Sequence, residues 1–181
     1  MTQPSRRLFL RRSAGLAAAL PLAFAPSAWA AMAPTRSLAF DHLHTGEKLS
    51  LVYAEREAYV PDALVRLNHL LRDHYSGEVG VIDPQLFDLL FRVQQTLGAS
   101  RPFEVISAYR GAATNERLRN TGGGGVASKS LHLQGQAIDI RIAGVPLSDL
   151  RKAALSQQGG GVGFYAREQF VHVDTGRVRS W

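Results

Sequence analysis

Two apolar segments near the end of the chain contain polar side chains that a protein core normally excludes. The segment 137–142 alternates around Asp139, and the segment 170–174 alternates around His172. Alternation with a period of two is typical of buried strands. A carboxylate in such a strand needs a cation or hydrogen bonds to offset the loss of its hydration. The sequence therefore predicts two neighbouring strands whose polar side chains share a partner.

A third residue, His132, lies seven positions before Asp139 and completes a set of metal-ligating side chains. Two imidazoles and one carboxylate make a three-ligand set for zinc that leaves a fourth position for water, which is the arrangement of a catalytic site. A structural zinc site more often uses thiolates, and this chain has no cysteine. We predict a zinc hydrolase with one zinc ion per chain, held by His132, Asp139 and His172. The alternative for each residue alone is a hydrogen-bonded core histidine or a structural aspartate.

The amino terminus has the pattern of an export signal. Residues 5–11 contain a pair of arginines, the apolar stretch 14–24 follows, and small residues at positions 28 and 30 suit a signal peptidase. We therefore predict a twin-arginine signal peptide over residues 1–30, cleaved before Ala31, and export to the periplasm by the twin-arginine (Tat) machinery. Pro21 interrupts the apolar stretch and Pro26 follows it, and the stretch is shorter than the roughly 20 residues of a membrane span, so we expect no stable membrane anchor.

Much of the formal charge of +6 belongs to this leader. Residues 1–30 hold four arginines and no acidic residue, so the rest of the chain carries a charge of +2. Its Lys and Arg residues are interspersed with acidic ones, which argues against nucleic acid as a partner. Without cysteine there are no disulfides, so stability must come from a packed core, and about 150 residues suffice for one domain.

The hydrophobic periodicity predicts a single α+β domain over residues 37–181, preceded by a short linker over 31–36. Helices come early, and a small, mainly antiparallel sheet carries the metal residues late. The expected elements are a hairpin of 37–40 and 48–53 around Gly46, helices from Pro61 to Gly77 and from Pro84 to Leu97, a strand over 103–108, a short helix over 115–119 within the polar, glycine-rich stretch 111–130, a strand over 137–142, a helix over 148–157 with Ser148 as its N-cap, and strands over 162–165 and 170–174.

One longer pattern resembles the M15-type zinc peptidases, which belong with the hedgehog and D-alanyl-D-alanine peptidase fold: Ser130-x-His132-x-x-Gly135-x-Ala137-x-Asp139, followed by His172. Residues 107–110 are similar to the strand-end arginine motif of that family. The likeness to the periplasmic murein endopeptidases of the family extends over nearly the whole chain: the leader, 43–47, 160–163, 170–176 and Trp181.

This resemblance implies a zinc peptidase whose metal ligands are His132, Asp139 and His172. It also implies peptidoglycan peptides as the substrate, with cleavage of cross-links between two diaminopimelate residues. Ser130 and Tyr109 are then expected to contact the substrate. Two other functions stay open, namely a peptidoglycan carboxypeptidase and a non-catalytic wall-binding module with a metal site.

This sequence departs from the family pattern at the residue that carries the proton in such a peptidase. Many relatives have a glutamate three residues before the last histidine ligand, and here that position is Gln169. Asp174 shares a strand face with His172 and is our first expectation for the general base, although it is equally suited to orient that ligand. Glu168 is the next candidate. Arg110, at a strand end, suits stabilisation of the oxyanion of a tetrahedral intermediate.

Overall fold

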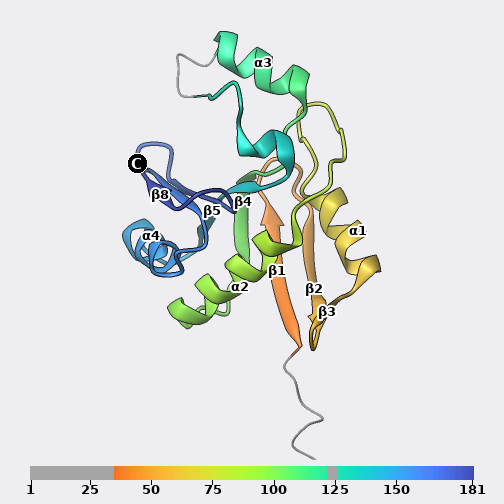
Figure 1. Ribbon diagram of the computed structural model, residues 1–181, viewed down its shortest axis with the longest axis vertical. Helices are drawn as coiled ribbons and strands as arrows, with labels where there is room; N and C mark the ends of the chain where they lie inside the picture. Colours follow the sequence, from red (N-terminus) through yellow and green to blue (C-terminus); the bar gives the residue numbers. More distant parts are fainter. Residues whose placement is uncertain (1–34, 122–125) are drawn as a thin grey trace, which may run out of the picture. The chain divides into compact units, whose positions relative to one another are not determined.

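The computed structural model describes residues 35–121 and 126–181, and within these ranges four α-helices flank one eight-stranded sheet (Figure 1). The predicted leader and most of the expected linker lie outside the described residues. The elements are β1 (Arg36–His42), β2 (Lys48–Glu55), β3 (Ala58–Tyr59), α1 (Pro61–Leu70), α2 (Pro84–Leu97), β4 (Phe103–Ser107), α3 (Ala112–Thr121), the 3₁₀ helix η2 (Leu131–Gln134), β5 (Ala137–Ile142), α4 (Leu147–Ser156), β6 (Gly161–Tyr165), β7 (Phe170–Asp174) and β8 (Arg179–Ser180).

The strands follow the order β3-β2-β1-β4-β5-β7-β6-β8 across the sheet. Neighbours are antiparallel except for the parallel pairs β1–β4 and β6–β8. The predicted α+β class with a mainly antiparallel sheet is therefore confirmed. The sheet is wider than expected because β3 and β8, with two residues each, are too short to leave a periodic pattern in the sequence.

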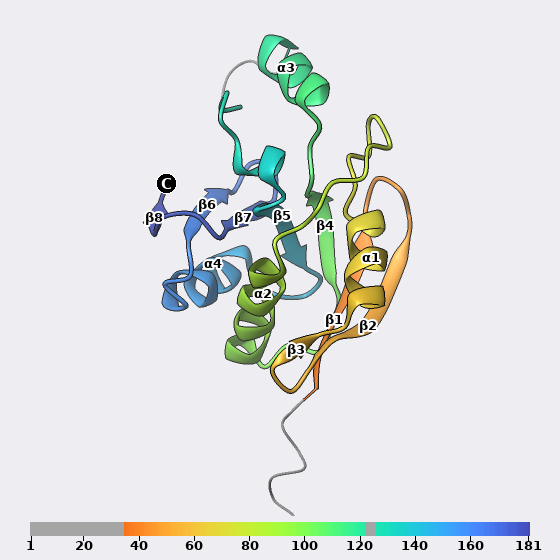
Figure 2. The same ribbon diagram turned by 45° about the vertical axis from the view of Figure 1, so that its right-hand side comes forward.

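One face of the sheet packs on the helices. Residues from α1, α2 and α4 share a single hydrophobic core with alternate residues of the strands, including Ile138 and Ile140 of β5 and Val171 and Val173 of β7. Both views show these three helices beside the sheet, whereas α3 lies apart from them (Figure 2). Because side chains alternate along a strand, the residues between the core positions face the opposite side of the sheet. The predicted metal ligands of β5 and β7 lie on that side.

Helix α2 illustrates how local signals set the boundaries of an element. The carboxylate of Asp83 accepts a hydrogen bond from the Gln85 amide at 3.0 Å and caps the amino terminus. At the other end Gly98 has a φ of 60°, the left-handed conformation of a helix C-cap. Both boundaries agree with the predicted ones. No helix in the described ranges is both long and apolar enough to cross a bilayer.

Three helices differ from the prediction in their boundaries. Helix α1 ends at Leu70 rather than near Gly77. The carboxylate of Asp73 accepts hydrogen bonds from the backbone amides of Tyr75 and Ser76, and these bonds turn the chain. Helix α3 is ten residues long, twice the expected length. The N-cap of α4 is Pro146, and Ser148 makes no capping hydrogen bond, so its predicted capping role was wrong.

Candidate metal centre

The 3₁₀ helix η2 brings His132 to the polar face of the sheet. Gly135 ends this helix with a φ of 65°, a conformation that lets the chain turn directly into β5. The His132 ring is buried, and its Nδ1 lies 2.6 Å from the carbonyl oxygen of Ala108. A carbonyl can only accept, so Nδ1 carries the proton. The lone pair of Nε2 therefore points away from the carbonyl and toward the strands.

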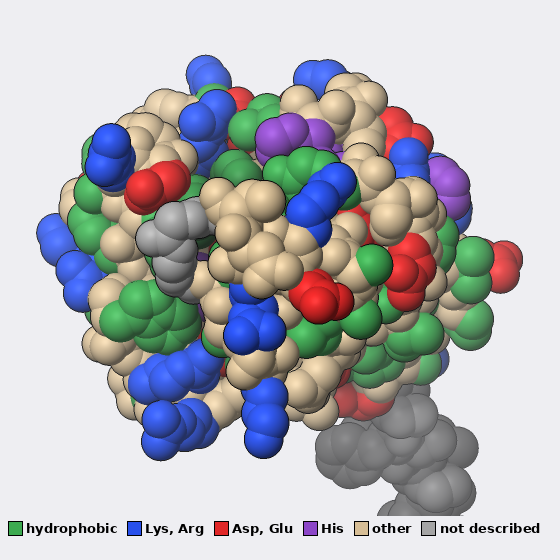
Figure 3. All heavy atoms as spheres, turned by 90° about the horizontal axis from the view of Figure 1, so that it is seen from above, with side chains coloured by type: hydrophobic (Ala, Val, Ile, Leu, Met, Phe, Trp, Pro, Cys, Tyr) green, Lys and Arg blue, Asp and Glu red, His purple; other side chains and the backbone are tan. Residues whose placement is uncertain are grey.

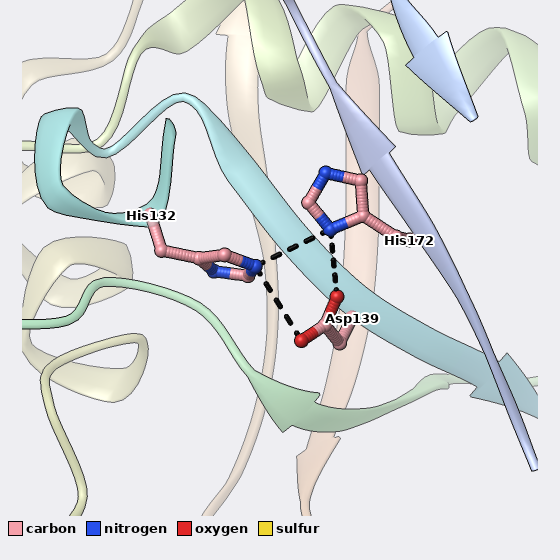
Figure 4. A group of neighbouring side chains, drawn as sticks. All are labelled: His132, Asp139 and His172. Atoms are coloured by element: carbon pink, nitrogen blue, oxygen red, sulfur yellow. Dashed lines mark hydrogen bonds and ion pairs between the residues drawn. The ribbon is translucent and has the colours of Figure 1, made fainter. Parts of the chain in front are cut away.

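Asp139 and His172 are direct partners in the antiparallel pairing of β5 and β7. Both side chains are buried on the polar face, and Asp139 Oδ1 lies 2.8 Å from His172 Nδ1. His132 Nε2 completes the group, 3.3 Å from His172 Nδ1 and 3.4 Å from Asp139 Oδ2 (Figure 4). The register of two strands and one short helix thus converges three ligand atoms on a single point.

The spacing of these atoms fits a tetrahedral zinc ion. Ligands about 2.0–2.1 Å from such an ion lie roughly 3.3 Å from one another. The distances from His132 Nε2 to His172 Nδ1 and to Asp139 Oδ2, 3.3 and 3.4 Å, have this value, and the other carboxylate oxygen, Oδ1, lies 2.8 Å from His172 Nδ1. The donor set of two imidazoles and one carboxylate also suits zinc. The residues therefore fit the ion without rearrangement of the backbone.

The remote nitrogen of each imidazole has an acceptor, as is usual for histidine ligands of metals. For His132 that acceptor is the Ala108 carbonyl. For His172 it is Asp174, whose Oδ2 lies 3.1 Å from Nε2. The ring nitrogens that face the common point, His132 Nε2 and His172 Nδ1, are therefore the ones that a metal ion would bind.

The electrostatics of the group favour a cation at this point. Burial opposes the charge on His172, but hydrogen bonds with Asp139 and Asp174 raise its pKa to about 9. Burial alone would raise the pKa of Asp139, yet the charges and hydrogen bonds of His132 and His172 hold it well below its usual range. The carboxylate is therefore ionised at neutral pH. A metal ion would take the place of the proton that His172 otherwise binds.

Asp174 lies at the end of β7 and is fully buried, with an exposure of 0%. Its carboxylate accepts hydrogen bonds from His172 Nε2, from the amides of Gly161 (2.9 Å) and Gly176 (2.8 Å), and from the guanidinium of Arg179. Burial opposes ionisation, but these donors hold the pKa of Asp174 well below its usual range. Both oxygens of this carboxylate therefore already accept hydrogen bonds from donors of the protein.

A cavity of about 530 Å³ lies over the three ligands, with basic and aromatic side chains in its wall. Its lining residues are Arg110, Val126, Ala127, Lys129, Ser130, Leu131, His132, Asp139, Tyr165, Glu168, Phe170, His172, Arg179 and Trp181. Figure 3 looks onto the molecule from the side of α3, and there most Lys and Arg side chains lie at the left and along the lower edge. A cavity with several cations suits a substrate that carries carboxylates.

The structure brings together most of the residues selected from the sequence. His132, Asp139 and His172 form the group itself, and Arg110, Ser130 and Glu168 line the cavity. Tyr109 and Asp174 are not among the residues that line the cavity. Tyr109 donates its phenol hydrogen to Glu78 Oε1 at 2.8 Å, and Asp174 is buried beneath His172.

Sequence reasoning gave no role to several residues of the wall: Lys129, Tyr165, Phe170, Arg179 and Trp181. Tyr165 and Phe170 lie at the ends of predicted strands, where a periodic pattern does not assign a site role, and β8, which carries Arg179, is only two residues long. Phe170 and Trp181 belong to the family pattern, but the sequence alone does not show which residues they contact. The Trp181 indole Nε1 donates to the Tyr165 hydroxyl at 2.9 Å.

Comparison with known proteins adds to this geometry. The family described as "Peptidoglycan L,D-endopeptidase MepK" matches residues 30–181. A protein of that name from Escherichia coli is 47% identical over 146 residues, which cover 81% of this chain and 80% of the relative. The "Probable peptidoglycan L,D-endopeptidase MepK" of Haemophilus influenzae is 41% identical over 167 residues, 90% of this chain and 89% of that protein.

Proposed function

Because this chain belongs to the family of the peptidoglycan L,D-endopeptidase MepK, we propose that it is a zinc peptidase that hydrolyses peptide cross-links in peptidoglycan. The cross-links are those between two diaminopimelate residues. The observation that carries the proposal is the buried group of His132, Asp139 and His172 at the base of the cavity. A zinc ion bound there would lower the pKa of a coordinated water to about 7 and polarise the scissile carbonyl.

Arg110 acts on the oxygen of the scissile carbonyl as negative charge develops there. It lines the cavity, and its backbone amide donates to the His132 carbonyl at 3.1 Å, which fixes its position relative to a ligand. Among the described residues, the guanidinium bonds only Asn115, at 3.4 Å, and Ser107, at 3.5 Å, and both contacts are long. It therefore keeps donors for the substrate, as an oxyanion-stabilising group must.

Glu168 is the proton carrier in this proposal. A general base must reach the reacting water and hold a free lone pair. Glu168 is exposed, and besides Asp139 it is the only carboxylate residue among the described residues that line the cavity. Asp174, our first expectation from the sequence, has no exposed surface, and its oxygens accept from other donors. These contacts favour the alternative role for Asp174, that of orienting His172.

The substrate peptide is bound along the edge formed by the loop that precedes η2. Ser130 and Lys129 both line the cavity there, and a hydroxyl and an ammonium group suit the carbonyls and carboxylates of a stem peptide. Tyr109 has no substrate contact in this proposal, because its ring packs over Gly80 and its hydroxyl bonds Glu78. The leader over residues 1–30 directs the chain through the Tat machinery to the periplasm, where peptidoglycan lies.

The test is incubation of purified protein with cross-linked muropeptide dimers, followed by mass analysis of the products. We expect dimers linked between two diaminopimelate residues to fall to monomers faster than dimers linked through D-alanine. Release of terminal D-alanine alone would identify a carboxypeptidase. Binding to peptidoglycan with no change of mass would identify a non-catalytic module. His132→Ala serves as the control that retains the chain but lacks a ligand.

A further inference from the structure

The last strand of the chain reaches the metal centre through an ion pair. β8 pairs in parallel with β6 at the edge of the sheet, and Arg179 is its first residue. The guanidinium bonds both oxygens of Asp174, with Nη1 3.2 Å from Oδ1 and Nη2 2.8 Å from Oδ2. A planar guanidinium that bonds both oxygens fixes the rotation of a carboxylate, which a single point charge does not.

Asp174 in turn decides which nitrogen of His172 faces the metal. Its Oδ2, 3.1 Å from His172 Nε2, can only accept, so Nε2 keeps its proton and Nδ1, which faces Asp139, is the nitrogen that would give up its proton to a metal ion. Oδ1 is held by two backbone amides, those of Gly161 and Gly176. Apart from His172, the one donor to Oδ2 within the described residues is Arg179. The orientation of the oxygen that holds the ligand therefore depends on the guanidinium.

The chain terminus also covers the ring of His172. The centroids of His172 and Trp181 are 5.3 Å apart, and the Arg179 guanidinium lies 4.9 Å from the Trp181 ring. Gly163, opposite His172 on β6, leaves room for the indole, because a Cβ there would lie 2.7 Å from it. Trp181 thus limits rotation of the His172 ring from one side, while Asp174 holds the ring through its Nε2.

From this chain of contacts we infer that Arg179 is a positioning residue of the metal centre, acting through Asp174 on the ligand His172. The inference rests on the zinc site of the proposed function. Without the guanidinium, Oδ2 loses its other donor and the carboxylate can rotate away from Nε2. His172 then no longer presents Nδ1 in a fixed direction. Loss of such an outer hydrogen-bond partner typically lowers metal affinity by about 10–100-fold.

The experiment compares zinc affinity in wild-type protein, Arg179→Gln and Arg179→Lys, measured by competition with a chromogenic chelator. Arg72→Gln is the matched control, because Arg72 makes an ion pair of similar length (2.7 Å, to Glu47) and lies outside the cavity lining. We expect Arg179→Gln to bind zinc about 10–100-fold more weakly. Arg179→Lys should recover only part of the affinity, because an ammonium cannot bond both oxygens. Arg72→Gln should bind zinc like the wild type.

The visible spectrum of cobalt-substituted protein gives a second readout that general destabilisation does not move. The cobalt bands should change in Arg179→Gln and stay unchanged in Arg72→Gln. Equal zinc affinity and equal cobalt spectra for Arg179→Gln and wild type would overturn the inference. A wild type that binds zinc but cleaves no muropeptide would overturn the proposed function alone, and the affinities would still decide this one. A wild type that binds no zinc would overturn both.

Discussion

At the scale of single residues, Glu168 and Asp174 differ in their access to the cavity. Glu168 lines it and is exposed, whereas Asp174 is fully buried beneath His172. We therefore predict that Glu168→Gln keeps its zinc and lowers kcat by about 10²–10⁴-fold, the usual contribution of a general base. Zinc content and turnover of cross-linked muropeptides are the measurements. Glu57→Gln, at an exposed turn outside the cavity lining, should leave both unchanged.

Comparison of Glu168→Gln with Asp174→Asn decides which of the two carboxylates is the base. If Asp174 were the base, Asp174→Asn would retain zinc at wild-type affinity and lose turnover, and Glu168→Gln would stay active. If Asp174 orients His172, Asp174→Asn weakens zinc binding as well, because the amide Oδ1 or Nδ2 no longer matches the five donors around it.

At the scale of elements, the turn from η2 into β5 depends on a glycine. Gly135 has a φ of 65°, and a Cβ there would lie 1.9 Å from the backbone oxygen of Val81. We predict that Gly135→Ala lowers the free energy of unfolding by more than the roughly 1–2 kcal/mol of left-handed strain alone. Gly144→Ala is the control, because Gly144 has a φ of 80° but no atom within 4 Å of such a Cβ. Equal losses in chemical denaturation would show that the contact with Val81 is unimportant.

Helix caps give a second prediction at this scale. Asp83 caps α2, and its Oδ2 also accepts from the Thr175 hydroxyl at 2.8 Å, which ties the helix to the chain just after β7. Asp83→Ala should lower the free energy of unfolding by about 0.5–2 kcal/mol. Ser148→Ala should change it little, because Ser148 does not cap α4. A large loss in Ser148→Ala would contradict the cap assignment.

The elements were predicted best where the local pattern is long. The 14 residues of α2 have a clear apolar stripe and two caps, and β5 has its predicted bounds. Other boundaries depend on contacts that sequence spacing does not contain. Asp73, which ends the α1 region, also accepts from the Gly111 amide at 2.9 Å, from a residue 38 positions away. The short elements η2, β3 and β8 form only because longer ones hold them.

At the scale of the whole molecule, two histidines outside the metal centre link stability to pH. The Nε2 atoms of His42 and His74 are buried and have no hydrogen-bond partner within the described residues. Burial first, and then the neighbouring histidines, lower the pKa of both, that of His74 to about 4. Near His74, Arg110 lowers its pKa further and Asp73 raises it.

A folded-state pKa below the unfolded value of 6.5 stabilises the fold above that pH, and this contribution is lost as the pH falls toward 4. We predict that the melting temperature of metal-free protein falls between pH 6.5 and 4, and that it falls less steeply in His74→Gln. Scanning calorimetry of both proteins in a chelator measures the two slopes. Parallel curves would mean that His74 does not contribute.

The grouping of three polar side chains could be predicted from the sequence, whereas most contacts around the group could not. His132, Asp139 and His172 stand in a recognisable spacing, and the structure brings their side chains together. The support around them comes from long-range pairing: Arg179 reaches Asp174 only because β8 joins the sheet beside β6. The sequence does not distinguish the roles of Glu168 and Asp174, because the first is exposed and the second buried only in the folded structure.

The zinc dependence of peptidoglycan cleavage tests the central claim most directly. Metal-free protein is titrated with zinc while the conversion of diaminopimelate-linked muropeptide dimers to monomers is followed. We predict that activity rises in proportion to bound zinc, reaches its maximum at one ion per chain, and stays at background in His132→Ala at the same zinc concentrations. Full activity in the metal-free protein, or in His132→Ala without bound zinc, would contradict the assignment of this group as the catalytic metal centre.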